Sequence, residues 1–127
     1  MEKDEFTKLV VNGLERIIFE GEIGTSQSYV IYQLSPQYYV QIAGSRGDLN
    51  VHCEAVGNSF IEFSTQINGH QIQQLLKLGW SEAGDMNHTI ELPVDSIESR
   101  QKLAELFYET AAIYGATTIS NVEVEIG

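Results

Sequence analysis

The tripeptide His52-Cys53-Glu54 groups the side chains most able to bind a metal ion or to carry out nucleophilic catalysis. Apolar and polar residues alternate around it, which is typical of a β-strand with one buried face. Neighbouring side chains on a strand point to opposite faces, so His52 and Glu54 share one face and Cys53 points to the other. A Cys–His pair therefore cannot form within this segment. We interpret Cys53 as a small buried hydrophobic residue, packed with Leu49 and Val51.

The other potential ligands and acid–base pairs are isolated in the sequence. His70 and His88 stand alone, and neither a Cys-x-x-Cys nor a His-Glu-x-x-His pattern occurs. The sequence therefore predicts no metal and no other cofactor. Glu123 and Glu125 share one face of a predicted strand, and we interpret them as solvated. Because no side chains are arranged for acid–base or nucleophilic work, we expect no enzymatic activity.

The segment around Phe60, Ile61 and Phe63 is short, strongly apolar and preceded by the turn-like Gly57-Asn58-Ser59. It fits either a strand or an extended loop. Two interpretations remain open: these residues belong to the hydrophobic core, or they form a contact surface for a partner. On the second interpretation, Phe60, Ile61 and Phe63 are the candidate partner-binding residues.

Helical and strand periodicities alternate along the chain. Apolar residues spaced by three and four predict a first helix that begins near Asp4 and stops at Gly21. A second helix is expected from Asn68 to Gly79. A third begins with the capping-box-like pair Asp95 and Glu98 and stops at Gly115. Strands are predicted over residues 28–34, 38–43, 49–55 and 89–92, and a last strand includes Val122, Val124 and Ile126.

The order of these elements is helix, three strands, helix, strand, helix, strand. Short connections make the first three strands an antiparallel meander. The sequence therefore predicts an α+β fold, with an antiparallel sheet packed on one side by helices. A length of 127 residues suits a single domain over residues 1–127.

Charge and composition exclude several classes of partner. Acidic residues outnumber basic ones by 18 to 7, which gives a net charge of −11. Such a surface repels nucleic acid and attracts basic partners. No apolar run approaches the roughly 20 residues of a membrane span, so we expect no membrane insertion. Cys53 is the only cysteine, and Met1 to Glu5 lack the features of a signal peptide. We therefore expect a cytoplasmic protein.

From Tyr38 onward the chain carries motifs of a known family. Strand, turn and helix-end motifs occur in the family's order, at Tyr39-Val40-Gln41-Ile42, Glu54, Val56-Gly57-Asn58, Leu78-Gly79-Trp80, Asn87 and Tyr114-Gly115. The sequence resembles the TY-Chap, YbjN-like domains of the type III secretion chaperone-like superfamily. It departs from many relatives after Trp80, where Ser81-Glu82-Ala83 replaces an early proline.

The resemblance implies an α-β-β-β-α-β-(β)-α order and a chaperone or adaptor that binds proteins or peptides. It also implies a homodimer and no catalytic residues. The motif residues are then structural positions, namely Glu54, Asn58, Leu78, Gly79, Trp80 and Asn87. An alternative hypothesis is an immunity or antitoxin-like protein, because a small acidic domain can mask a basic toxin.

Overall fold

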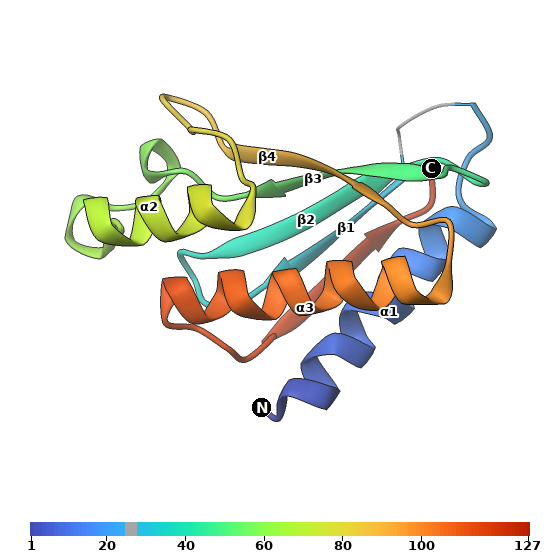
Figure 1. Ribbon diagram of the computed structural model, residues 1–127, viewed down its shortest axis with the longest axis horizontal. Helices are drawn as coiled ribbons and strands as arrows, with labels where there is room; N and C mark the ends of the chain where they lie inside the picture. The colour runs from blue at the N-terminus through green and yellow to red at the C-terminus, as the bar shows by residue number, and fades with distance from the viewer. Residues whose placement is uncertain (25–27) are drawn as a thin grey trace.

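A computed structural model describes residues 1–24 and 28–127. Within this part of the chain, the strands form one antiparallel sheet with the order β4-β3-β2-β1-β5, and α1 and α3 pack against one of its faces (Figure 1). The strands are β1 Ser28–Gln33, β2 Tyr39–Gly44, β3 Asn50–Ala55, β4 His88–Pro93 and β5 Asn121–Glu125. The helices are α1 Lys3–Glu20, α2 Gly69–Leu78 and α3 Ile97–Tyr114, with short 3-10 turns η1 Asn58–Phe60 and η2 Phe63–Thr65. The predicted α+β class is confirmed.

The element order follows the periodicity of the sequence. The optional strand that the resemblance places between β4 and the last helix is not formed in the described residues, because β4 ends at Pro93 and Ser96 already caps α3. The fifth strand instead follows α3 and pairs with β1, from Tyr29 opposite Glu125 to Gln33 opposite Asn121. It therefore lies at the edge of the sheet farthest from β4.

Helix α1 packs closely on β1 because its inner face is apolar and narrow. Phe6, Val10 and Leu14 are fully buried. The hydroxyl of Tyr32 on β1 donates a hydrogen bond to the carbonyl of Val10 at 2.6 Å. A Cβ atom at Gly13 would collide with that hydroxyl. Glycine is therefore required for this approach of helix and strand.

The helix ends agree with the sequence except at the start of α3. Asn68 caps α2 in a capping box with Gln71, as expected. The predicted pair Asp95 and Glu98 is wrong by one residue. Ser96 is the N-cap of α3, since its hydroxyl accepts the Ser99 N–H at 2.9 Å and the Ser99 hydroxyl accepts the Ser96 N–H at 3.0 Å.

The alternation in β3 is confirmed, but not at its first position. Val51, Cys53 and Ala55 face the helices and are buried, while His52 is half-buried on the opposite face. Leu49 was expected on the buried face and is 66% exposed. It precedes β3 at the end of the sheet, where its carbonyl accepts the Val94 N–H while most of its side chain stays in contact with solvent.

None of the helices within the described residues combines the length and the apolar character needed to cross a lipid bilayer.

Candidate functional site

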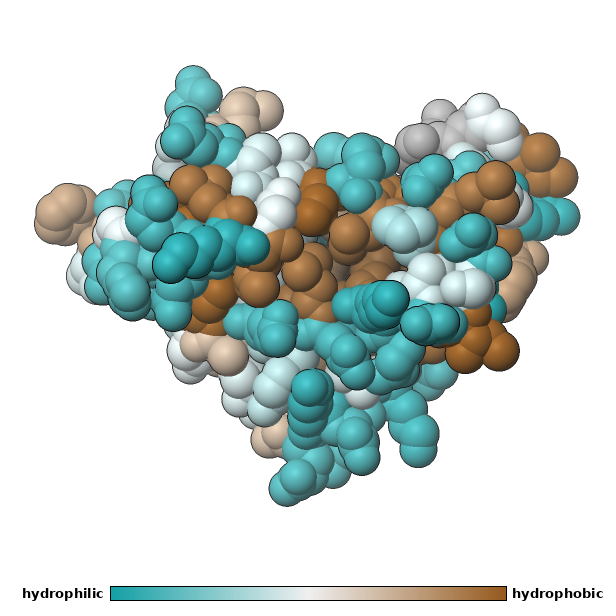
Figure 2. All heavy atoms as spheres, viewed as in Figure 1, coloured by the Kyte–Doolittle hydropathy of each residue, from teal (hydrophilic) through white to brown (hydrophobic). Residues whose placement is uncertain are grey.

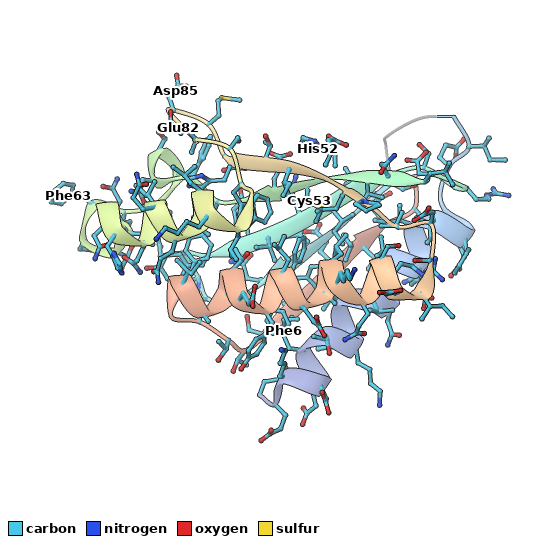
Figure 3. All side chains as sticks on the ribbon, in the orientation of Figure 1. Phe6, His52, Cys53, Phe63, Glu82 and Asp85 are labelled. Carbon is cyan, nitrogen blue, oxygen red and sulfur yellow. The ribbon has the colours of Figure 1, made fainter. Side chains whose placement is uncertain are left out.

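The apolar segment after β3 divides between the core and the surface. It forms the turns η1 and η2 instead of a strand. Ile61 is 6% exposed and belongs to the core, whereas Phe60 is 57% and Phe63 is 90% exposed. Figure 3 shows Phe63 projecting from the end of the molecule beside α2. The core interpretation is therefore right for Ile61 and wrong for the two phenylalanines.

Asn58 fixes the shape of this segment. Its side-chain nitrogen Nδ2 donates to the carbonyl of Ile67 at 2.9 Å, and its Oδ1 accepts the Ile67 N–H at 3.0 Å. The Gln66 side chain returns a hydrogen bond to the Asn58 carbonyl at 3.0 Å. These bonds close the loop of residues 58–67, so Phe60 and Phe63 are presented by an ordered backbone.

Asn87 joins this loop to the connection before β4. Its Oδ1 accepts the Gly57 N–H at 3.0 Å. Its Nδ2 lies 3.2 Å from the Tyr39 hydroxyl and 3.3 Å from Glu54 Oε1. A Cβ atom at Gly57 would collide with the Met86 carbonyl, so the two segments are in close contact. We call residues 57–67 and 81–87 together the loop end.

Trp80 anchors the loop end to the helical layer. Gly79 has a φ of 109°, a left-handed conformation that ends α2 and turns the chain inward. Trp80 is 2% exposed, and its indole Nε1 donates to Thr110 Oγ1 on α3 at 3.0 Å. Leu78 is half-buried against the core. This motif therefore orients α2 and the start of the second loop.

The loop end combines exposed apolar side chains with negative charge. Met86 is 64% exposed, in addition to Phe60 and Phe63. The segments also carry the exposed acidic residues Glu62, Glu82 and Asp85 and contain no lysine or arginine. In Figure 3 the labelled Glu82 and Asp85 lie on the connection beside α2. Such a surface can bury apolar side chains and attract basic groups.

A shallow groove of about 280 Å³ runs beside this surface, between α2 and the chain leading into β4. Its walls come from Asn58, Ile72, Gln73, Leu76, Glu82, Ala83, Gly84 and His88. The groove gives the loop end a concave side next to its projecting aromatic residues.

The sequence candidates for metal or catalytic chemistry do not converge. His52 Nδ1 lies 2.6 Å from Glu91 Oε1 on the open face of the sheet, and its Nε2 lies 3.6 Å from Glu54 Oε2. Cys53 points to the helices, and burial raises the pKa of its thiol, which keeps it protonated. His88 is buried against the Ser81 carbonyl, with Nδ1 at 2.8 Å from the oxygen. Residues 1–24 and 28–127 bring together no set of ligands that could hold a metal ion.

Sequence reasoning missed an apolar groove between β4 and α3. It measures about 380 Å³ and is lined by Leu92, Pro93, Ser96, Glu98, Ser99, Lys102, Leu103 and Leu106. Figure 2 shows apolar side chains gathered between these two elements. Leu106 lies on the same side of α3 as the buried Leu103 and Phe107, but it is only half-buried. The spacing of apolar residues along a helix is the same whether a residue lines a groove or lies inside the core, so the sequence pattern could not reveal this groove.

Comparison with known families identifies the chain. The model of TY-Chap3, described as the T3SS (YopN, CesT) and YbjN peptide-binding chaperone 3, matches residues 12–115. Searches of curated proteins and of solved structures gave no match. The matched region contains β1 to β4, α2, α3 and the loop end, and it stops before β5. The chain therefore belongs to the TY-Chap3 family of peptide-binding chaperone domains.

Proposed function

We propose that this protein binds segments of client proteins at the loop end, through Phe60 and Phe63, and acts as a chaperone or adaptor without catalysing a reaction. The observation that carries the proposal is the 90% exposure of Phe63 on a loop held by side-chain hydrogen bonds. Ordering a flexible loop opposes binding, and a loop that is already ordered reduces that penalty.

The energetics support an apolar contact tuned by charge. Burying one large apolar side chain contributes about 1.5–3 kcal/mol. Together Phe60 and Phe63 would therefore contribute about 3–6 kcal/mol to client binding, while the buried Ile61 holds their backbone to the core. The acidic residues of the loop end would speed the approach of clients with basic flanking residues.

The proposed partners are protein or peptide clients and a second copy of the chain. We place the protein in the cytoplasm as a homodimer that neither binds nucleic acid nor inserts into membranes. The net charge of −11 supports the proposal that the protein does not bind nucleic acid, because a negative surface repels the phosphate backbone. The exposed Phe19 and Leu49 lie outside the loop end and offer apolar surface for a twofold contact.

A second candidate function is immunity-like binding of a basic toxin. Where the structure describes the strands, their open face carries Glu54, Glu91, Glu123 and Glu125 but neither lysine nor arginine. A complex made by this face would weaken steeply with salt, whereas a contact through Phe60 and Phe63 would change little.

Site-directed photo-crosslinking in the native host tests the chaperone proposal. The photoreactive amino acid p-benzoylphenylalanine replaces Phe63 in one strain and Ile97, which is 80% exposed away from the loop end, in a control strain. We expect position 63 to capture specific proteins that position 97 does not. Identical captured proteins at both positions, or none at position 63, would count against a client site at the loop end.

A further inference from the structure

The two edges of the sheet differ in how many unpaired backbone N–H and carbonyl groups they present to an added strand. In an antiparallel ladder, successive residues direct their backbone groups alternately to one neighbour and to the other. The Val94 N–H donates to the Leu49 carbonyl at 2.8 Å. Since Leu92 pairs with Val51 two residues further along each strand, the even-numbered residues of β4 bond to β3. Its odd-numbered residues face outward.

The outer edge of β4 is closed at both ends. The Thr89 N–H donates to Ser81 Oγ at 2.9 Å, and the Thr89 carbonyl accepts the Ser81 N–H at 2.9 Å. Pro93 has no N–H to donate. Among the outward-facing residues of β4, and within the part of the chain that the structure describes, only Glu91 keeps both its N–H and its carbonyl free for a partner. This edge therefore cannot support the run of hydrogen bonds that an added strand needs.

The outer edge of β5 is open. The Ser120 N–H donates to the Gln33 carbonyl at 2.8 Å, so the odd-numbered residues of β1 face β5. With Ile31 opposite Glu123, the odd-numbered residues of β5 bond to β1. The backbone groups of Val122 and Val124 then point away from the sheet. Among the described residues, they hydrogen-bond to no third segment.

Side chains along β5 specify what could pair with it. Val122 and Val124 lie opposite the buried Tyr32 and Val30, on the helix side. Glu123 and Glu125 are exposed on the open face. A second copy paired antiparallel through this edge would place glutamate opposite glutamate, which is unfavourable. Lysine or arginine at those positions would instead form favourable cross-strand pairs.

We propose that the β5 edge binds an extended client segment in which apolar residues alternate with lysine or arginine, adding it to the sheet as a further strand. The apolar residues would continue the helix-side surface of Val122 and Val124, and the basic residues would lie beside Glu123 and Glu125. This inference rests on the proposed peptide-binding function and adds a second contact, outside the region shared with the family.

The test uses two short soluble peptides, one alternating valine with lysine and one alternating valine with glutamate, titrated into the isotopically labelled full chain. We expect the lysine peptide to bind and to shift the amide signals of residues 121–125. The double variant Glu123→Lys with Glu125→Lys should weaken the lysine peptide by about tenfold and favour the glutamate peptide, since two attractive pairs become repulsive.

Proline substitutions separate the two edges. Val124→Pro removes an outward N–H without removing a bond to β1, and it should weaken the lysine peptide by at least about tenfold. Glu91→Pro makes the same change at β4 and should leave binding within about twofold. Equal effects of the two variants, or no effect of Val124→Pro, would overturn the β5 site.

The location of the signal changes separates this inference from the proposed function. Shifts confined to residues 57–67 and 81–87 would overturn the β5 site while supporting a client site at the loop end. Absence of peptide binding would also overturn the β5 site, and the crosslinking at position 63 would still decide the proposed function by itself.

Discussion

Replacing Asn87 with alanine should destabilise the protein by about 2 to 4 kcal/mol. The substitution removes the acceptor of the buried Gly57 N–H and the donor to Tyr39 and Glu54. A typical hydrogen bond contributes about 0.5–1.5 kcal/mol, and a buried donor left without a partner costs about 1–3 kcal/mol. Because Asn87 is only half-buried, we expect the loss of stability to stay below the sum of the upper limits of these two ranges.

Urea unfolding can measure this loss through the fluorescence of Trp80, the only tryptophan of the chain. Asn12→Ala, at an exposed position of α1, is the matched control and should change the free energy of unfolding by less than about 0.5 kcal/mol. Amides of residues 57–67 should also exchange faster in Asn87→Ala than in the control. A loss no larger than that of Asn12→Ala would refute the assignment of Asn87 as the link between the two loops.

Three further predictions concern packing, pH and assembly. Gly13→Ala should cost about 1–3 kcal/mol in a denaturant titration through its collision with the Tyr32 hydroxyl, and Tyr32→Phe in the same chain should recover part of that loss. Stability should fall as the pH rises above about 8.5, since burial raises the folded-state pKa of Cys53 and the unfolded chain loses that proton first. Cys53→Ala should delay the fall to about pH 10, where Tyr32 and Tyr114, whose pKa values burial also raises, act in the same direction. Light scattering after size exclusion should give about twice the chain mass of 14.2 kDa, and a monomer mass throughout the micromolar range would contradict the homodimer.

Local patterns predicted the elements well because their causes are local. The alternation around Cys53 follows from the two-residue period of a strand, and the structure places Cys53 and His52 on opposite faces. The start of α3 shows the limit of this reasoning. Asp95 and Ser96 both belong to residue types that cap helices, and the choice depends on where the chain leaves β4.

The candidate site depends on contacts that no local pattern contains. The Asn87 side chain binds the Gly57 N–H across a separation of 30 residues. Asn58 closes its loop across nine residues. These bonds turn Ile61 inward and leave Phe60 and Phe63 exposed, so composition alone left core and surface open. Likewise, alternation predicted the last strand, but the neighbour of β5 and its free edge follow only from the pairing with β1.

The measurement that tests the central claim most directly is made on the double variant that carries both Phe60→Ala and Phe63→Ala. Its client affinity and its folding stability are compared with those of the unchanged protein. Ile97→Ala is the control for loss of exposed apolar surface away from the loop end. For a client captured at position 63, we expect the double variant to lose about a hundredfold or more in affinity, since two apolar contacts of about 1.5–3 kcal/mol each are removed. Its free energy of unfolding should change by less than about 1 kcal/mol, because both side chains are exposed. Unchanged affinity, or a stability loss of about 3–5 kcal/mol typical of core truncation, would contradict the account.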